Sequence, residues 1–221
     1  VGTATVINLS SYSSLITVTI VLNLIGLMLG ATYFGLIAQQ VLPEDQRWSE
    51  SDVVSGIWLN WMRLTGLALT IIIALLLFSA PAFLLSSLLG LLHPALSFIT
   101  SSLAIIASMW VLFLLAFSMH GIVLRGCPIK RAIIDSAQLV SRNMPAAAAL
   151  LTIALLITWG LGYLWTIPDS DSWLLIIGLA GHAFITTGLV AASFIFYQDR
   201  YRWGREMQDW LNHQRADDQH V

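Results

Sequence analysis

Two histidines in strongly apolar surroundings are the residues of this sequence best suited to chemistry. His120 and His182 each have a small residue four positions earlier, Ala116 and Gly178 respectively. In a helix, that residue lies about one turn below the histidine and leaves room for a flat group against the helix. An imidazole nitrogen is also a good axial ligand for a metal. The spacing makes His182 and His120 candidate ligands of a metal-centred macrocycle.

The spacing around His182 and His120 resembles that of light-harvesting helices that ligate chlorophyll. That resemblance implies a bound chlorophyll-type pigment. Small residues are abundant in this sequence, however, so the spacing arises easily. We expect both histidines to pack between helices instead, each with a hydrogen bond to a neighbouring Ser, Thr or carbonyl. The sequence therefore predicts no cofactor, with a bound lipid or a chlorophyll-type pigment as the alternative.

The long apolar segments hold no set of residues that predicts catalysis. They contain no Asp, Glu, Lys or Arg, and no HExxH metal-ligand spacing occurs in the chain. A Ser–His–Asp triad cannot be assembled without a buried acid. The sequence predicts a protein that is not an enzyme. The lack of carboxylates at depth also disfavours a proton-coupled transporter or an ion channel.

Composition indicates a membrane protein. Hydrophobic residues make up 57% of the 221 residues and charged residues 10%, against roughly 25% charged in soluble domains. The net charge of −2 disfavours a nucleic-acid partner. The single cysteine, Cys127, excludes a disulfide within the chain.

Five segments are long and apolar enough to cross a bilayer, which takes about 20 residues. Backbone groups in lipid must be hydrogen-bonded within the segment, so each is predicted to be a helix. The fold class is therefore all-α, a polytopic transmembrane helix bundle. Pro81 falls inside the second segment and is expected to kink or end it. The five segments are Leu15–Ala38, Leu64–Leu89, Ala95–Leu124, Pro145–Thr166 and Trp173–Tyr197.

The basic residues indicate the sidedness of the protein. In a five-span arrangement all ten fall on one side, and Lys and Arg mark the cytoplasmic side. We expect the N-terminus to be outside and the C-terminus in the cytoplasm, in a bacterial cytoplasmic (inner) membrane. The basic residues are Arg47, Arg63, Arg125, Lys130, Arg131, Arg142, Arg200, Arg202, Arg205 and Arg215.

Two cytoplasmic connectors carry a helical pattern. In the second, Ile129, Ile133, Ala137, Val140 and Met144 recur at helical steps after Pro128. This pattern predicts an amphipathic elbow helix in the membrane interface, over Pro128–Asn143. A connector helix packed on other loops is the alternative. The stretch Ser49–Arg63 repeats the pattern 80 residues earlier and predicts a first elbow helix.

Each predicted elbow is followed by a span, a short outer turn and a returning span. This order predicts two parallel repeats related by an axis along the membrane normal. The predicted units are an N-terminal tail and first span (1–48), repeat 1 (49–125), repeat 2 (126–205) and a cytoplasmic C-terminal tail (206–221).

The first span has no partner in this scheme, and it carries a helix-packing pattern. Gly26 and Gly30 have GxxxG spacing in GLMLG, and Asn23 lies near the same face. We expect this face to meet another helix, from the repeats, from another subunit, or from an upstream segment, since the chain begins with Val1. Trp48, Trp58 and Trp61 are predicted as interfacial anchors, as are Lys130, Arg131, Arg142, Arg200 and Arg202 for their charge.

The combination of elbow helix and span in DSAQLVSRNMPAAAALLTIALLI, with FYQDRYR after the last span, resembles a group of bacterial multi-pass proteins. The group includes the membrane domain of some glycerophosphodiester phosphodiesterases and uncharacterised relatives. The resemblance covers Ser49 to Arg205. It implies a fold that commonly has six spans, and it carries over no catalytic residue.

These observations favour a non-catalytic integral membrane protein, a scaffold or accessory subunit that packs against other membrane proteins. Its expected partners are the lipid bilayer and other membrane protein subunits. A lipid- or pigment-binding membrane subunit is the first alternative, and a permease-like transport component is the second.

Overall fold

The computed structural model describes residues 11–165, 167 and 172–218, and every regular element among them is helical. The first ten residues, most of the predicted outer turn before Trp173 and the last three residues lie outside this part. Five helical segments are long and apolar enough to span a membrane, so the chain is an all-α, multi-pass integral membrane protein. The α-helices are α1 (Tyr12–Val41), α2 (Val53–Leu92), α3 (Pro94–Leu115), α4 (Ser118–Arg125), α5 (Ile129–Arg142), α6 (Met144–Trp165) and α7 (Trp173–Asp218).

Three of the predicted spans correspond to single helices. The first span is α1, the fourth is α6, and the fifth forms the first half of α7. Helix α7 does not end where its apolar run ends, because it continues to Asp218. The predicted C-terminal tail is therefore helical over most of its length.

The prediction of a separate first elbow helix is wrong. Two short 3-10 turns, Glu44–Gln46 and Glu50–Asp52, lead into α2, which runs without a break from Val53 to Leu92. Pro81 does not end the second span, since α2 continues through it. Transmembrane helices tolerate an internal proline because neighbouring groups satisfy the freed carbonyl.

The second elbow helix is confirmed as a helix separate from its span. Helix α5 ends at Arg142, and Asn143 leaves the helical region with φ −124° and ψ 35° before α6 begins. The difference from α2 has a local cause. Pro145 has no backbone N–H and disfavours a continuous helix before it, whereas the residue 80 positions earlier is Thr65.

The buried face of α5 overlaps the predicted stripe at Val140 but is turned from the rest of it. Its buried residues are Ala132, Ser136, Leu139 and Val140, whereas Ile129 and Ile133 are only half-buried and Met144 is exposed. The partners of this face are other helices, chiefly α3 and α4. Helix α5 therefore packs on other helices of the chain through its buried face.

The third predicted span is two helices with a break at Ala116 and Phe117, and a side chain from α5 closes this break. Ser136 is fully buried there. Its Oγ accepts a hydrogen bond from the N–H of Phe117 at 3.1 Å and donates one to the carbonyl of Leu114 at 2.7 Å. One hydroxyl thus satisfies two backbone groups that the break leaves unpaired. The break reorients α4 toward α5 and α7.

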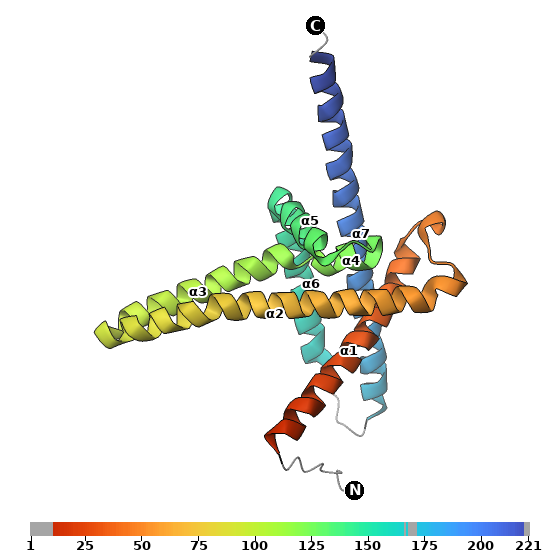
Figure 1. Cartoon of the computed structure of the whole chain (residues 1–221). Coiled ribbons are helices and arrows are strands. Elements are labelled where there is room, and N and C mark those ends of the chain that lie inside the picture. Colours follow the sequence, from red (N-terminus) through yellow and green to blue (C-terminus); the bar gives the residue numbers. More distant parts are fainter. Residues whose placement is uncertain (1–10, 166, 168–171, 219–221) are drawn as a thin grey trace.

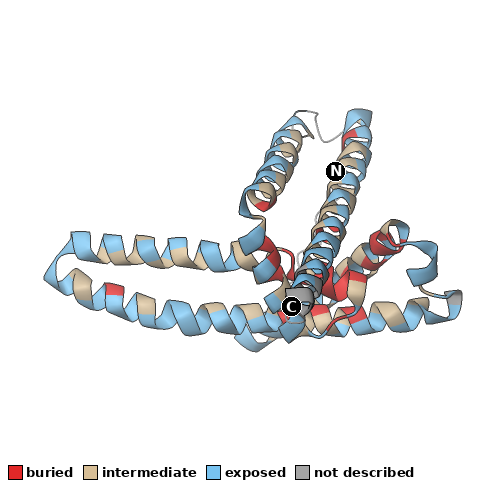
Figure 2. Cartoon of the chain, turned by 90° about the horizontal axis from the view of Figure 1, so that it is seen from above, coloured by how far each residue is buried: buried red, intermediate tan, exposed pale blue. Residues whose placement is uncertain are grey.

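The helices form an open arrangement instead of a tight parallel bundle. Helices α6 and α7 run side by side, α1 lies obliquely beside α7, and the α2–α3 hairpin projects to one side (Figure 1). The buried residues gather where α1, the first half of α2, α4, α5 and α7 meet, and the outer part of the hairpin is largely exposed (Figure 2). This meeting point is the only place where side chains from five helices are packed together in the part described.

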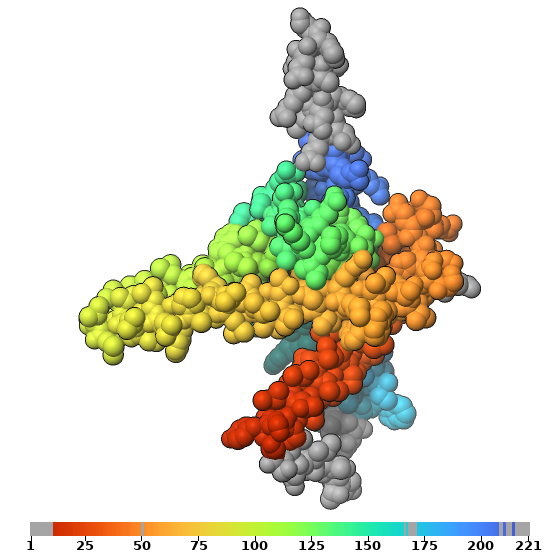
Figure 3. All heavy atoms as spheres, viewed as in Figure 1, coloured from red at the N-terminus to blue at the C-terminus, as the bar shows by residue number. Residues whose placement is uncertain are grey.

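The α2–α3 hairpin is held together by serines. Ser86 Oγ lies 2.7 Å from Ser101 Oγ and 2.9 Å from Ser97 Oγ, and it is 3.0 Å from the Ser97 carbonyl. Gly90 lets Ser97 approach closely, because a Cβ at Gly90 would lie 3.3 Å from the Ser97 Cβ. The two helices therefore form a cohesive arm, which the space-filling view shows reaching away from the other helices (Figure 3).

The apolar run of α2 is longer than the hydrocarbon layer of a bilayer is thick. At about 1.5 Å per residue, the apolar run Leu64–Leu92 is about 44 Å long, whereas the hydrocarbon layer is about 30 Å thick. A run of this length fits the bilayer only when tilted. Helix α6 is about 33 Å long by the same measure and needs little tilt.

We predict that the tip of the arm reaches the outer surface. In a background with Cys127 changed to alanine, a cysteine at His93 should react with a membrane-impermeant maleimide in sealed cells, and one at Lys130 should react only after lysis. The reason is that the α2–α3 turn carries no Lys or Arg, whereas α5 carries several. Labelling of the Lys130 site in sealed cells would contradict this sidedness.

Candidate functional site

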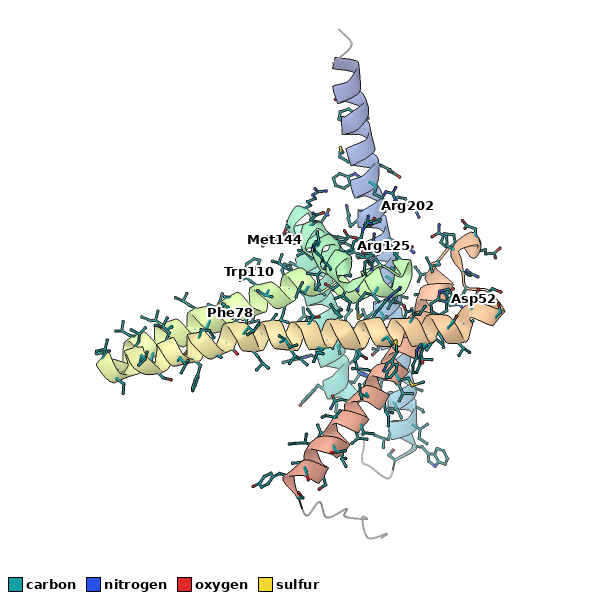
Figure 4. The ribbon with its side chains drawn as sticks, viewed as in Figure 1. Asp52, Phe78, Trp110, Arg125, Met144 and Arg202 are labelled. Atoms are coloured by element: carbon teal, nitrogen blue, oxygen red, sulfur yellow. The ribbon has the colours of Figure 1, made fainter. Side chains whose placement is uncertain are left out.

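The most elaborate polar cluster lies at the end of α4, where Arg125 joins α4 to α5 and α7 (Figure 4). Its guanidinium forms an ion pair with Asp135 of α5 and donates a hydrogen bond to the Tyr197 hydroxyl at 2.7 Å. The guanidinium carbon also lies 3.7 Å from the centre of the Tyr201 ring, within the range of a cation–π interaction. The side chains of Arg125 and Asp135 are 22% and 16% exposed, so the pair is largely shielded from water.

The backbone around Arg125 is fixed by a helix cap. Gly126 has a positive φ of 59°, and its N–H donates to the Ile122 carbonyl at 2.9 Å. This is a left-handed C-terminal cap that favours glycine. The Gly126 carbonyl then accepts a hydrogen bond from Arg63 of α2 at 2.6 Å. The cap therefore holds Arg125 in place and ties α2 to the same junction.

Cys127 packs beneath the cluster as a structural residue. The residue is 8% exposed, and its thiol donates to the Gly121 carbonyl at 3.0 Å. Burial raises the pKa of the Cys127 thiol, although the nearby Arg125 charge opposes this. A raised pKa disfavours the thiolate, which is the nucleophilic form of cysteine. The arrangement of Arg125, Asp135, the two tyrosines and Cys127 is therefore that of a clamp between helices.

His120 lies inside the buried junction next to this clamp. Its Nε2 is 2.8 Å from Ser193 Oγ of α7, and the Ser193 hydroxyl donates to the Val190 carbonyl at 2.7 Å. Since that hydroxyl has one proton, Nε2–H of His120 is the donor to Ser193. The ring of His120 packs on Phe194 with centroids 4.8 Å apart and on Phe117 at 5.1 Å. This geometry is that of a histidine that packs one helix on another.

Around His182, the space beside Gly178 is occupied by an indole. A Cβ at Gly178 would lie 3.0 Å from Trp165, and one at Gly181 would lie 3.2 Å from the same ring. The small residue one turn before His182 therefore accommodates Trp165 from the end of α6. A shallow apolar hollow of about 370 Å³ remains beside His182 and Trp165. The glycine spacing before His182 therefore has an explanation in helix packing.

The GLMLG face of α1 is not covered by the repeats of this chain. A Cβ at Gly26 would have no atom within 4 Å, and one at Gly30 would meet only the Phe34 ring at 3.9 Å. Asn23 donates to the Thr19 carbonyl of its own helix at 2.8 Å instead of reaching across. The possibility that the protein's own repeats cover Gly26 is therefore wrong for the described residues.

The close contact of α1 lies further along, at Trp48. A Cβ at Gly35 would lie 3.3 Å from the Trp48 ring, and one at Gly56 of α2 would lie 2.8 Å from it. Trp48 is thus inserted between α1 and α2. Trp61 also faces α1, where its indole N–H donates to the Leu24 carbonyl at 3.2 Å. Trp58 is 48% exposed, and its ring centre lies 4.7 Å from that of Trp61 in a tilted arrangement.

The predicted interfacial cations divide into two groups. Arg131 and Arg142 of α5 and Arg200 of α7 line one polar hollow of about 240 Å³, together with Arg205. Lys130 and Arg202 are exposed and lie outside it. Arg202 instead borders a neighbouring hollow of about 400 Å³ that includes Arg125 and Tyr201.

The sequence pattern singled out FYQDRYR but did not indicate the partners of its tyrosines. Tyr197 and Tyr201 lie four residues apart on one face of α7. Their partner, Arg125, is the last residue of α4. Asp135 offered the available signal, because it is the single acidic residue between Arg125 and Pro145. A lone acid among basic residues next to an apolar core is a candidate for a buried ion pair.

Comparison of the chain with protein-family models, with curated proteins and with solved structures gives no match. The contacts and the open faces of the described residues are therefore the observations that bear on the function of this protein.

Proposed function

We propose that this protein is a non-catalytic membrane subunit that assembles with another membrane protein through the fork between α3 and α6. The observation that supports the proposal is the shape of the fold. The α2–α3 arm diverges from α6, which packs chiefly on α7 and α5. A helix face left open beside a cohesive arm is suited to receiving a transmembrane helix from a partner.

The lining of the fork fits an apolar helix. A hollow of about 380 Å³ opens between the two helices, where Trp110 of α3 lies close to Met144 of α6 (Figure 4). Large side chains of α3 line one side, and Met144 and the small Ala148 of α6 line the other. Small residues allow a second backbone to approach closely in lipid. The lining residues are Ile106, Met109, Trp110, Phe113, Met144 and Ala148.

A second open face supports assembly independently of the fork. Gly26 of α1 has free space above it, and GxxxG spacing favours close approach of a helix. The clamp at Arg125 supplies no nucleophile, since the Cys127 thiol is buried and its pKa is raised. A structural role in a complex accounts for the open face at Gly26 and for a clamp without a reactive thiol.

We predict that a photo-crosslinking residue in place of Trp110 will form a protein adduct in cells at native expression. The adduct is expected because the fork brings Trp110 against a partner helix, and it can be identified by mass spectrometry after mild-detergent purification. Trp159, which is 75% exposed on α6 and does not line the fork, is the matched control.

A variant that fills the fork tests whether the adduct at the Trp110 position comes from a specific contact or from random collision. Ala148→Phe places a ring in the hollow and should reduce the Trp110 adduct several-fold while leaving the α5–α7 clamp intact. Adducts with lipid only at Trp110, or equal protein adducts at Trp110 and Trp159, would contradict the proposal.

A further inference from the structure

The polar hollow between α5 and α7 holds four arginines that converge from two helices. Arg131 and Arg142 come from α5, and Arg200 and Arg205 come from α7. Arg131 and Arg142 are three helical turns apart and so lie on one face of α5. Gly204 forms part of the wall, and a Cβ there would meet no atom within 4 Å. The absence of a side chain at Gly204 keeps the hollow open.

The positive charge of this hollow is not balanced within the described chain. Its one carboxylate, Asp135, is already paired with Arg125 and lies 3.9 Å from Arg131. Arg200 lies 3.7 Å from Asp199, whose side chain is 69% exposed. Arg142 and Arg205 form no ion pair with any residue that the structure describes. An anion with several acceptor oxygens would relieve this excess of charge.

One arginine also has an unused donor. The Nε of Arg200 is buried, and its distance of 3.7 Å from Asp199 Oδ2 is too long for a hydrogen bond. A buried guanidinium N–H without an acceptor is costly. Gln138 and Asn143 line the same hollow, and their amides add neutral donors to the charged ones. The donor set matches a phosphate group, which accepts hydrogen bonds on several oxygens at once.

The position of the hollow points to a lipid as the source of the phosphate. It lies where α7 passes from its apolar run into DRYRWGR, and Trp203, 47% exposed, lines it. Tryptophan is enriched at this level of the bilayer, beside the headgroups. Asn143 belongs to the arginine hollow and the next residue, Met144, belongs to the apolar fork. Polar and apolar binding surfaces therefore meet at the α5–α6 elbow.

We propose that the hollow lined by Arg131, Arg142, Arg200 and Arg205 binds the phosphate headgroup of an anionic phospholipid. Basic pockets between transmembrane helices on the cytoplasmic side recognise such headgroups by charge and hydrogen bonding. The site is separate from the proposed assembly fork, and binding of lipid does not require a protein partner.

The test uses the full chain in detergent and measures its thermal unfolding and its lipid adducts by native mass spectrometry. Short-chain phosphatidylglycerol should bind and raise the unfolding temperature, and short-chain phosphatidylcholine should do so weakly. Inorganic phosphate at the same concentration is the arm that separates a free anion from a lipid. Equal stabilisation by inorganic phosphate and phosphatidylglycerol would overturn the lipid assignment.

Two variants separate the site from general surface charge. Arg142→Gln with Arg205→Gln removes two exposed arginines that form no ion pair with a described residue and should weaken phosphatidylglycerol binding roughly 10- to 30-fold. Lys130→Gln with Arg202→Gln removes the same charge outside the hollow and should weaken binding clearly less, because exposed charges away from the site are screened by water and salt. Gly204→Leu fills the hollow without removing charge and should weaken binding as the arginine variant does. Equal losses in the two charge variants, or wild-type binding by Gly204→Leu, would overturn the site.

Discussion

Replacing Asp135 with alanine is expected to lower the free energy of unfolding by about 3–5 kcal/mol. The change removes the carboxylate that pairs with Arg125 and leaves that guanidinium largely shielded from water with no opposite charge. Tyr197 and Tyr201 remain in contact with Arg125, but a hydroxyl and a ring face cannot neutralise its charge. The loss can be measured as a lower midpoint of thermal or denaturant unfolding in detergent.

Asp199→Ala provides the matched control for this prediction. Asp199 also pairs with an arginine, Arg200, but its side chain is 69% exposed. Exposed ion pairs contribute about 0–1 kcal/mol, so this variant should unfold close to the wild type. The double variant Arg125→Leu with Asp135→Leu removes both charges and should recover part of the stability lost in Asp135→Ala. Similar losses for Asp135→Ala and Asp199→Ala would show that the Arg125 pair is not a shielded clamp.

Transmembrane helices were predictable from the sequence because their signal is local. A long apolar run without charge must be helical in lipid, whatever surrounds it. Residue types alone were therefore enough to locate α1, α6 and the first half of α7. The break between α5 and α6 was also predictable in kind, because Pro145 lacks the N–H that a continuous helix needs.

The bounds of α2, α3 and α4 were harder to predict from the sequence than those of the other spans. Residues 53–63 have an amphipathic pattern like that of α5, yet without a proline at position 65 they join the span in one helix. The split of the third span into α3 and α4 depends on Ser136 of α5, which supplies hydrogen bonds to Leu114 and Phe117. The residues around Phe117 do not indicate that Ser136, 19 residues further along the chain, bonds to its N–H.

The clamp was missed for a similar reason. Arg125 was interpreted as a marker of the cytoplasmic side, and its charge does lie at a helix end. Its specific partners come from α5 and α7, the latter 72 residues away at Tyr197. Spacing within one helix cannot reveal such a contact. In the GLMLG motif, by contrast, the local pattern predicts a helix contact, but no described residue packs against Gly26.

Gly121→Ala should destabilise the protein by about 1–3 kcal/mol even though it replaces a glycine inside a helix. Alanine in place of glycine normally favours a helix by about 1 kcal/mol. Here the new Cβ would lie 2.9 Å from the Tyr197 hydroxyl and 3.3 Å from the Cys127 sulfur. Tyr197 is 1% exposed and its ring stacks on Tyr201, so it cannot move aside freely.

We expect Gly121→Ala to lower stability because its methyl group displaces Tyr197. Two comparisons test this cause. Gly160→Ala in α6 adds a Cβ with no atom within 4 Å and should unfold no earlier than the wild type. Tyr197→Phe removes the hydroxyl that the Gly121→Ala methyl meets, so adding Gly121→Ala to Tyr197→Phe should cost clearly less than adding it to the wild type. If Gly121→Ala costs the same in both backgrounds, the contact between α4 and the Tyr197 hydroxyl does not set the packing at this junction. If the cost falls as expected, the tyrosine that binds Arg125 also requires a glycine at position 121, and the clamp and the close approach of α4 to α7 depend on the same contact.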